Sequence, residues 1–545
     1  MVKSDGSNLP RKRALSSPKK TSCGPKQPRV STPTAAKGHA KALSIAKAAI
    51  PRAVWQCPRA DTEDTYHVQL TKELCKCLSK ENRKNIAEVF GMLRESGNEL
   101  IVGTACSGSE VHDKVGSIVM KTMSEDTIAY RTAFACENDK RKQQWILKVA
   151  FGGLKGDDCP HLFQDVCSLA CGRASCVAHG AHEAPTTCQV PHGSHGPQLV
   201  LMSFSCKDIS KLKTGWHHRP TKALQDETSS TGQTFMAVIQ YLEKCRPNIY
   251  SGENLAAIAT SPDLMMDAEQ AFQNIGYVCR ARVISSDDYT SPQKRQRTFF
   301  LAFEIWNSGA DPQDARQTLD RIFNLMEKMK RPSKPLGDFL LQGEDEYLVA
   351  QRETIMSNKS AKQNDNTWCD PYAAILRGQG ITLSQCIPSS EQRNSSWYPC
   401  LCERERVVLG YHMLLKGQVT CCNLSQRLTQ ASTSITDDVI TLLPGQRLWL
   451  ANLAPPHEPR FLLGREALAI QGWPIEDLHD MQGWDYLMTE LAGNAISGQI
   501  WMAILVAMLA CTPATMFMRN DSGSAPTAAE QDQLLDLVSD IASMD

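Results

Sequence analysis

The stretch that decides the fold is Gln198-Leu-Val-Leu-Met-Ser-Phe-Ser-Cys206-Lys-Asp-Ile-Ser210. Its apolar run from Leu199 to Met202 has no polar alternation, which favours a strand buried on both faces of a parallel sheet. Cys206 follows in a small, polar turn, and open α/β sheets bind their ligands just beyond the carboxyl ends of the strands. The pattern therefore predicts that Cys206 is a reactive residue. The alternative is a buried structural cysteine, the commoner fate of a free thiol.

Strands and helices alternate on both sides of this stretch. Residues 79–97 predict an amphipathic helix that gathers one apolar face, made of Ile86, Val89, Phe90 and Leu93. Strands are expected at residues 100–103, 132–136, 162–163, 199–203, 248–250, 278–284 and 299–303, with a helix at 235–242 among the segments between them. This alternation predicts an α/β fold with a doubly wound, mostly parallel sheet.

The first strands end in residues suited to a nucleotide-like cofactor. Residues 100–103 lead into Thr104-Ala-Cys-Ser-Gly-Ser-Glu110, a small-residue turn before a helix N-terminus, where a cofactor can be held. Glu137 stands at the tip of the second strand, the usual place for an acid that binds a ribose hydroxyl pair. Asp165, followed by Val166, marks the tip of a third candidate strand.

The composition is that of an ordinary globular chain. Of its 545 residues, 42% are apolar and 22% are charged. The 21 cysteines form no repeating framework, which favours free thiols in a reducing compartment, a few of them on metal. No signal peptide is visible, and the apolar run from Ile500 to Cys511 is too short to span a bilayer. The run predicts a buried helix, and no membrane partner is expected.

The two ends of the chain carry opposite charge. Residues 1–52 contain one acid, Asp5, among many lysines and arginines, and are expected to be a disordered basic arm. Pro10-Arg11-Lys12-Arg13 and Pro18-Lys19-Lys20 indicate either a nuclear localisation signal or a phosphate-binding arm, with a solvated tail as the alternative. Residues 513–545 are expected to be an acidic tail.

Six segments stand in an order along the chain that is typical of one enzyme family. They are Ser203-Phe-Ser-Cys206-Lys-Asp-Ile-Ser210, Gly252-Glu253-Asn254-Leu255, Tyr289-Thr-Ser-Pro-Gln293-Lys-Arg295-Gln-Arg297, Arg465-Glu466-Ala-Leu, Gln471-Gly472-Trp-Pro474 and Gly493-Asn494-Ala495. Together they resemble the motifs of the C5-cytosine-specific DNA methyltransferases that use S-adenosylmethionine. The resemblance runs from about Leu100 to Leu509 and indicates a divergent eukaryotic-type member.

The resemblance implies a Rossmann-like methyltransferase fold and transfer of a methyl group to C5 of cytosine in DNA. Because C5 is a poor nucleophile, a thiolate must first add at C6, and Cys206 would form that adduct on a flipped-out base. The resemblance gives Glu253 the role of protonating N3, while Arg295 and Arg297 hold the base O2 and orient Glu253. A free thiol is mostly protonated at neutral pH, so the two arginines are expected to help ionise Cys206.

The resemblance also implies where S-adenosylmethionine and the remaining motif residues lie. The candidate cofactor ligands are Gly108, Ser109, Glu137 at the ribose, Asn138, Asp165 at the adenine amine, Val166, and Asn494 from the C-terminal helix. Substrate-binding or structural roles fall to Asn254, Gln293, Arg465 and Gln471, and Asn254 is expected to fix a loop. Taken alone, residues 293–297 favour a solvated basic strand edge.

The chain departs from the family pattern at six positions, one of which is Asn138, where the family often has an aromatic or aliphatic residue. Ser205 stands where the family has Pro, and Lys207 where it has Gln. In the first turn, Thr104 replaces the usual Asp, Cys106 an aromatic residue, and Glu110 a second Gly. These departures bear on cofactor affinity and loop rigidity more than on the type of reaction.

The motifs divide the chain into six segments. Residues 1–52 form the arm, 53–98 a helical lead-in, 99–303 the catalytic core, 304–445 a smaller inserted target-recognition region, 446–512 the late motifs that return to the core, and 513–545 the tail. Specific readout by the recognition region needs side chains at base edges, and the sequence does not single out which ones reach them. The aromatic and basic residues of the region include Trp368, Trp397, Tyr411, Arg404, Arg406 and Lys416.

Cysteines and histidines gather between Asp165 and Gln198. Cys171, Cys176, His179 and Cys188 have spacings compatible with a structural zinc site, and the alternative is a loop of free thiols and imidazoles. The resulting hypothesis is a nuclear DNA cytosine-5 methyltransferase with a possible zinc-stabilised insert. Two alternatives are an RNA cytosine-5 methyltransferase of the tRNA type and a catalytically degenerate binding module with the same fold.

Overall fold

The structure, a computed structural model, describes residues 65–518 except 107, 126, 155, 181–184, 211–221, 344, 360–366, 479–480 and 482. All described residues belong to one compact unit, residues 57–545. The predicted basic arm, residues 519–545 of the predicted acidic tail and His182 of the Cys/His-rich segment lie outside the described residues. The first residues of the tail are described: Ala514–Phe517 form a short helix in which Met516 and Phe517 are buried.

Within the described part of the chain, nine strands form one sheet in the order β5-β4-β3-β2-β1-β6-β7-β9-β8. The strands are β1 (Glu99–Ala105), β2 (Ala129–Cys136), β3 (His161–Phe163), β4 (Arg173–Cys176), β5 (Thr186–Gln189), β6 (Leu199–Met202), β7 (Ile249–Leu255), β8 (Tyr277–Ser285) and β9 (Gln296–Glu304). The central strands β3, β2, β1, β6 and β7 are parallel, whereas β9 is antiparallel to β7 and β8. This order confirms the predicted doubly wound, mostly parallel sheet.

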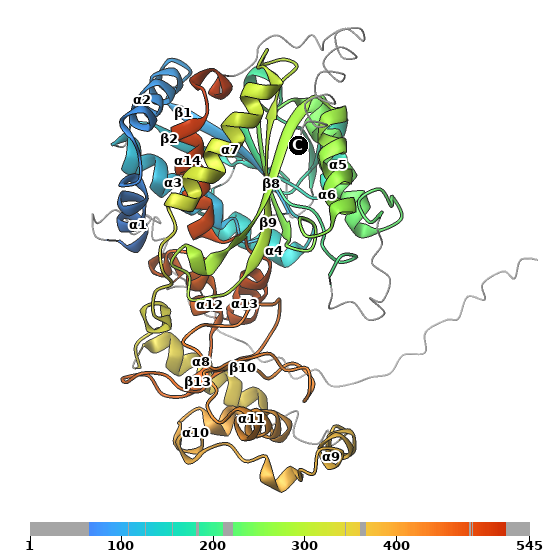
Figure 1. Cartoon of the computed structure of the whole chain (residues 1–545), viewed down its shortest axis with the longest axis vertical. Coiled ribbons are helices and arrows are strands. Elements are labelled where there is room, and N and C mark those ends of the chain that lie inside the picture. Colours follow the sequence, from blue (N-terminus) through green and yellow to red (C-terminus); the bar gives the residue numbers. More distant parts are fainter. Residues whose placement is uncertain are drawn as a thin grey trace, which may run out of the picture. The chain divides into compact units, whose positions relative to one another are not determined.

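Helices cover both faces of the sheet, as Figure 1 shows. One apolar core joins Leu199 and Leu201 of β6 to the face covered by α3 (Val111–Ser124), α7 (Pro312–Lys328) and α14 (Gly498–Cys511). A second core joins Val200 and Met202 to the opposite face, covered by α5 (Ser230–Cys245) and α6 (Pro262–Asn274). Strand β6 is therefore buried on both faces, as its unbroken apolar run predicts.

The expected helix at residues 79–97 forms as α2 (Lys80–Glu95), and it follows α1 (Tyr66–Cys75). Ser79 caps its first turn, because the Ser79 side chain accepts a hydrogen bond from the Asn82 N–H. The predicted apolar face is buried, namely Ile86, Val89, Phe90 and Leu93.

The apolar run near residue 500 forms α14, and Ile500 to Ala510 are all buried inside the molecule. Helix α14 packs against α2, α3 and α7, so it is the central helix of its layer. In the described ranges, no single helix has both the length and the apolar character needed to cross a membrane. Only the bent pair of α13 (Asp485–Asn494) and α14 meets that requirement jointly.

The remaining elements surround a second, smaller sheet. The helices are α4 (Lys140–Trp145), α8 (Glu346–Lys359), α9 (Cys369–Arg377), α10 (Ser390–Asn394), α11 (Glu403–Lys416) and α12 (Gly464–Ile470). The small sheet has the order β11-β10-β12-β13, with β10 (Cys421–Asn423), β11 (Thr433–Ser434), β12 (Leu448–Leu450) and β13 (Arg460–Phe461). The small sheet thus continues past residue 445, the predicted end of the recognition region. Helix α7, which belongs to the predicted recognition region, packs instead on β8 of the large sheet.

Candidate active site

Cys206 lies in the turn after β6, and hydrogen bonds from neighbouring elements hold that turn. The Ser205 N–H donates to Thr234 Oγ1 of α5 at 2.8 Å. Asn254 Nδ2 of β7 donates to the Phe204 carbonyl at 2.8 Å, so Asn254 ties the turn to the next strand. Cys206 is half-buried at the carboxyl end of its strand. The structure therefore places the thiol at the edge of the sheet where ligands bind.

Glu253 and two arginines lie on the strands beside this turn. Glu253 belongs to β7 and Arg297 to β9, and Arg297 Nε lies 2.9 Å from Glu253 Oε1. Arg295 Nη2 lies 3.7 Å from the same carboxylate oxygen. Glu253 and Arg295 are both buried, so this ion-pair cluster is little screened by solvent.

The electrostatics of Cys206 differ in one respect from the sequence-based expectation. Burial, and then the Glu253 carboxylate, raise the pKa of the Cys206 thiol above its ordinary value. Arg297 and Arg295 lower this pKa, as expected, but burial and Glu253 outweigh them. The thiol is therefore protonated at neutral pH in this structure, and the arginines alone do not ionise it.

Arg295 binds backbone carbonyls of the late motifs. Its Nη1 donates to the Gly493 carbonyl at 3.0 Å and to the Leu442 carbonyl at 3.3 Å, and its Nη2 donates to the Ala495 carbonyl at 3.0 Å. Burial, and then Arg297, lower the pKa of the Arg295 guanidinium, but from a starting value so high that it stays charged at neutral pH. Arg295 thus fastens β9 to the chain segments around residues 442 and 495.

The other motif residues also connect distant segments. Gln471 Nε2 donates to Gln293 Oε1 at 2.9 Å, which links the late motif to the segment before β9. Arg465 Nη2 donates to the Ile475 carbonyl at 3.2 Å, and its guanidinium lies over the ring of Tyr347. Both residues thus contact other parts of the protein.

The turn after β1, residues 104–110, lies beside the last motif, Gly493-Asn494-Ala495. Gly108 has a left-handed φ of +70°, and a Cβ placed there would lie 3.6 Å from Asn494 Cβ. The next residue, Ser109, accepts a hydrogen bond from Trp145 Nε1 at its carbonyl, at 3.1 Å. Trp145 in turn packs edge-on against Trp473 of the late motif. Residues from an early segment and from the late motifs, namely Trp145, Trp473 and Asn494, therefore lie around this turn.

Glu137 and Asp165 stand at the tips of β2 and β3. The Glu137 side chain is buried, and its Oε1 accepts from the Asp139 N–H at 2.9 Å. Burial raises the pKa of this carboxyl, while Lys142 and two backbone N–H groups lower it. Asp165 is exposed, and it accepts from the Cys167 N–H at 3.0 Å.

The remaining cofactor candidates differ in exposure, since Asn138 is exposed and Val166 is buried.

The thiol of Cys106, at the end of β1, is influenced by the acids at the tips of β2 and β3. Burial, and then the Glu137 carboxylate, raise the pKa of Cys106 to about 12, with a smaller contribution from Asp165. The two acids therefore act on the same small region at the tip of β1.

Two of the departures from the family pattern interact with each other. Thr104 Oγ1 donates to the Glu110 carboxylate at 3.0 Å and 3.2 Å, and His112 Nε2 lies 3.0 Å from Glu110 Oε2. All three side chains are fully buried, and Glu110 has a left-handed φ of 59°. The sequence analysis missed this network. The only available signal was that both substitutions fall in one turn.

The structure corrects the predicted metal ligands. Cys176, His179 and Cys188 do lie together, but the fourth member of the group is His161, and Cys171 is exposed and outside it. The reason is the pairing of β3 with β4, which sets Phe163 opposite Cys176 and brings His161 beside the two cysteines. Cys171 instead ends the short helix Val166–Cys171.

The aromatic and basic residues named in the recognition region are largely engaged within the protein. Trp397 and Tyr411 are buried, and Trp368 packs edge-on against Tyr372. Arg404 donates to the carbonyls of Leu424 and Gln426, Arg406 lies over the ring of Tyr398, and Lys416 donates to Thr433. These side chains stabilise the smaller sheet and its helices.

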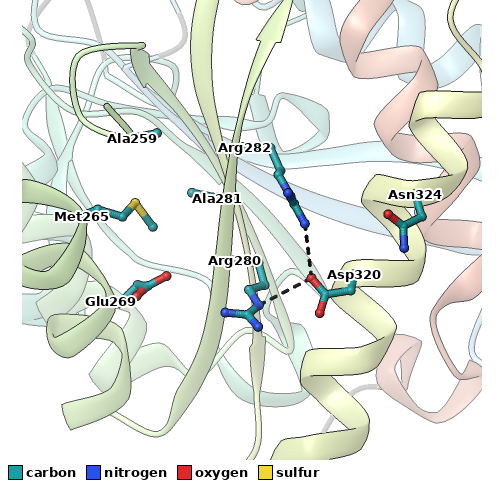
Figure 2. Close-up of a pocket in the computed structure, with 8 residues that line it drawn as sticks. All are labelled: Ala259, Met265, Glu269, Arg280, Ala281, Arg282, Asp320 and Asn324. Atoms are coloured by element: carbon teal, nitrogen blue, oxygen red, sulfur yellow. Dashed lines mark ion pairs between the residues drawn. The ribbon is translucent and has the colours of Figure 1, made fainter. Parts of the chain in front are cut away.

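A polar pocket lies on the edge strand β8, between α6 and α7 (Figure 2). Arg280 and Arg282 project toward Asp320, whose Oδ1 lies 3.5 Å from Arg280 Nε and 3.8 Å from Arg282 Nη2. None of the candidate catalytic or cofactor residues lines this pocket.

Comparison with known proteins identifies the family. The family model described as C-5 cytosine-specific DNA methylase matches residues 194–510, which is more than half of the chain. A DNA (cytosine-5-)-methyltransferase DMT5 of Cryptococcus neoformans var. grubii is 24% identical over 458 residues, covering 78% of this chain and 18% of the relative. The DMT5 of Verticillium dahliae is 21% identical over 492 residues, covering 76% and 20%. The chain thus spans about a fifth of the length of these curated relatives.

Among solved structures, Dnmt2 methyltransferase of S. pombe has 13% sequence identity and a TM-score of 0.39, covering 75% of this chain and 98% of its own. The methyltransferase EhMeth of Entamoeba histolytica has 10% identity and a TM-score of 0.40, with the same coverage. The fold itself is established by the strand order of the large sheet. On the family match, with its motifs in order on that sheet, the chain belongs to the C-5 cytosine-specific DNA methylases.

Proposed function

We propose that this chain transfers a methyl group from S-adenosylmethionine to C5 of cytosine in DNA through a covalent adduct between Cys206 and C6 of a flipped-out base. The observation that carries the proposal is the placement of Cys206 in the turn that follows β6, beside Glu253 on β7 and Arg297 on β9, with Glu253 Oε1 2.9 Å from Arg297 Nε. A thiol and a carboxyl group side by side supply the nucleophile and the proton donor that C5 activation requires.

The residues at the tips of β1, β2 and β3 fit the methyl donor. Ser109 Oγ is buried and has no hydrogen-bond partner among the described residues. Gly108 leaves open the space that a side chain would fill beside Asn494, and Glu137 and Asp165 offer carboxylate acceptors for hydroxyl and amine groups. When bound there, S-adenosylmethionine supplies an electrophilic methyl group on a sulfonium.

The proton balance of the site follows from its charges. The Cys206 thiol proton passes to the Glu253 carboxylate and the thiolate adds to C6. Glu253, now in its acid form, passes that proton to N3 as negative charge enters the ring. The resulting enamine is nucleophilic at C5. After methylation, loss of the C5 proton to a base and of N3–H back to Glu253 lets the Cys206 thiolate leave.

Glu253 and Cys206 are coupled in this scheme. The ionised Glu253 carboxylate raises the pKa of Cys206, so placing a proton on Glu253 removes that opposition and favours the thiolate. Arg297 and Arg295 then stabilise whichever of the two groups carries the negative charge. Deprotonation of Cys206 and protonation of Glu253 therefore occur in one step.

Replacing Glu253 with glutamine is expected to lower the pKa of Cys206, because the substitution removes a carboxylate that raises it and leaves both arginines. Alkylation of Cys206 by iodoacetamide, followed by peptide mass spectrometry across a pH series, should shift to lower pH. Methyl transfer should still fall by roughly 10²–10⁴-fold, because the general acid is lost. A shift of the alkylation profile to higher pH would contradict the coupling.

Replacing Glu137 or Asp165 with alanine is expected to weaken binding of S-adenosylmethionine. Each change removes a charge-assisted hydrogen bond worth roughly 1.5–3 kcal/mol, or about 10–100-fold in Kd. Isothermal titration calorimetry measures the effect directly. Glu269→Ala, in α6 and away from the strand tips, serves as the control with unchanged affinity. Unchanged affinity in both Glu137 and Asp165 variants would show that the donor binds elsewhere.

The nature of the substrate is tested with tritium-labelled S-adenosylmethionine and three nucleic acids: duplex DNA, single-stranded DNA and tRNA. We expect label in the cytosine of DNA, and enzymatic digestion followed by chromatography identifies 5-methylcytosine. Label confined to tRNA would replace the DNA proposal with RNA methylation. Binding of the donor and of DNA without transfer under any condition would indicate a non-catalytic module.

A further inference from the structure

Four side chains that take no part in the proposed reaction converge at the edge of the large sheet. His161 comes from β3, Cys176 ends β4, His179 lies in the following turn and Cys188 belongs to β5. One ligand atom from each lies within 4.8 Å of the other three. Cys176 is buried and the other three residues are half-buried, so the group is largely shielded from solvent.

The separations within this group match the edges of a metal tetrahedron. Cys176 Sγ lies 3.4 Å from His179 Nδ1 and 3.8 Å from His161 Nδ1, and Cys188 Sγ lies 3.6 Å from His179 Nδ1. Zinc–sulfur bonds of about 2.3 Å and zinc–nitrogen bonds of about 2.0 Å at tetrahedral angles give sulfur–nitrogen edges of about 3.5 Å. A cation at the centre would thus reach the three ligands His179, Cys176 and Cys188 with little movement.

The surroundings orient the two imidazoles. His179 Nε2 lies 3.1 Å from the Cys159 carbonyl, which fixes its proton on Nε2 and leaves Nδ1 as a lone-pair donor toward both sulfurs. A metal-binding histidine characteristically donates its other ring N–H to a carbonyl, as His179 does here. The second imidazole, that of His161, is oriented by stacking on Phe163, with 5.4 Å between ring centroids and 13° between the planes.

We propose that His161, Cys176, His179 and Cys188 bind one structural Zn²⁺ ion. Two thiolates and two imidazoles in a tetrahedron are the donor set that Zn²⁺ prefers, and four protein ligands leave no open position for a catalytic water. Binding releases the two thiol protons, so that S–Zn bonds replace S–H bonds and nothing is oxidised or reduced.

The ion would fasten the hairpin of β4 and β5 to β3. The short strand β3 leads directly to Asp165 and to the short helix Val166–Cys171, and that helix packs against α5, whose Thr234 holds the Cys206 turn. The zinc site would therefore stabilise the support of both the donor-binding acid and the catalytic turn. It acts on the position of these elements and takes no part in the chemistry.

The test is metal analysis of the full chain, purified under reducing conditions without chelator. Inductively coupled plasma mass spectrometry should find about one zinc per chain in the wild type and in Cys206→Ala. Cys188→Ser and His161→Ala should lose most of it. Cys171→Ser is the matched control: it alters an exposed cysteine of the same segment that lies outside the group, and it should keep its zinc. Because no step depends on methyl transfer, this result is independent of the proposed reaction.

Three outcomes would overturn the proposal. The first is metal-free wild-type protein that is folded by circular dichroism. The second is loss of zinc from Cys171→Ser with retention in His161→Ala, which would restore the ligand set expected from the sequence alone. The third is protein that, isolated without chelator or added reductant, carries no zinc but a Cys176–Cys188 disulfide, detected as two thiols that escape alkylation until reduction. If the ligand variants do not fold, wild-type metal content and the visible absorption of the Co²⁺-substituted chain still decide the matter.

Discussion

Cys206→Ala is expected to abolish methyl transfer, with a loss on the order of 10⁴-fold or more, because the variant lacks the only group proposed to add to C6. Binding of DNA and of S-adenosylmethionine should remain close to that of the wild type, since the Cys206 turn is held by Asn254 and Thr234 through other atoms. Transfer of labelled methyl groups and gel-shift titration measure the two properties separately. Cys245→Ala, a half-buried cysteine of α5, is the matched control and should retain activity.

The adduct itself can be isolated. On DNA that carries 5-fluorocytosine at the target position, the wild-type chain should form a complex stable to denaturing gels, because fluorine at C5 cannot leave as a proton. Peptide mapping should locate the attached base on Cys206. An adduct on another cysteine, or turnover by Cys206→Ala, would remove Cys206 from the mechanism.

Removing Arg295 is expected to lower the free energy of unfolding more than removing Arg297, although both arginines lie beside Glu253. Arg295→Leu removes a buried guanidinium that donates to the carbonyls of Leu442, Gly493 and Ala495. It should lower the free energy of unfolding by about 3–5 kcal/mol, because buried acceptors and part of the Glu253 charge are left unpaired. Arg297→Leu should cost less stability, because its side chain is more exposed and Arg295 still faces Glu253.

The two variants are separated by measuring stability and activity together. Urea unfolding followed by tryptophan fluorescence gives the stability difference, and methyl transfer at a temperature where both variants are folded gives the catalytic one. We expect Arg297→Leu to be folded and inactive. Equal losses of stability in the two variants would contradict the assignment of Arg295 as the residue that positions the late motifs.

The central sheet was predictable because its signals are local. An unbroken apolar run such as Leu199–Met202 needs only its own residues to indicate a doubly buried strand, and the tip of such a strand is a defined place. The position of Cys206 was therefore predicted from its own strand, whereas Glu253 and Arg297 were identified through the resemblance of their motifs to those of the family. The predictions of their catalytic roles now rest on that geometry and await the experiments above.

Contacts between distant segments were not predictable in the same way. His161 stands apart from the Cys/His-rich segment in sequence, and only the antiparallel pairing of β3 with β4 brings it to Cys176 and His179. The carbonyl partners of Arg295 are equally remote. Backbone acceptors leave no residue-type signal, so the carbonyl contacts of Arg295 could not be predicted from the sequence.

The buried network of Thr104, Glu110 and His112 illustrates a further limit. Taken singly, Thr104 and Glu110 look like losses of family residues, whereas in the structure each supplies the partner of the other. Single-position comparison with a family pattern cannot detect such compensation, because the information lies in the pair.

The central position of α14 has a consequence for synthesis on the ribosome. The strands and helices from β1 onward emerge first, yet the apolar layer formed by α2, α3 and α7 is not closed until α14 arrives. At roughly 5–20 residues per second, the interval of about 400 residues between β1 and α14 corresponds to about 20–80 s of translation. Strand β9 ends at Glu304, so over about the last 190 of those residues, or about 10–40 s, the large sheet is fully translated but lacks its last covering helix. A chain that stops before Gly498 would keep every strand of the large sheet and remain an aggregation-prone, uncovered intermediate.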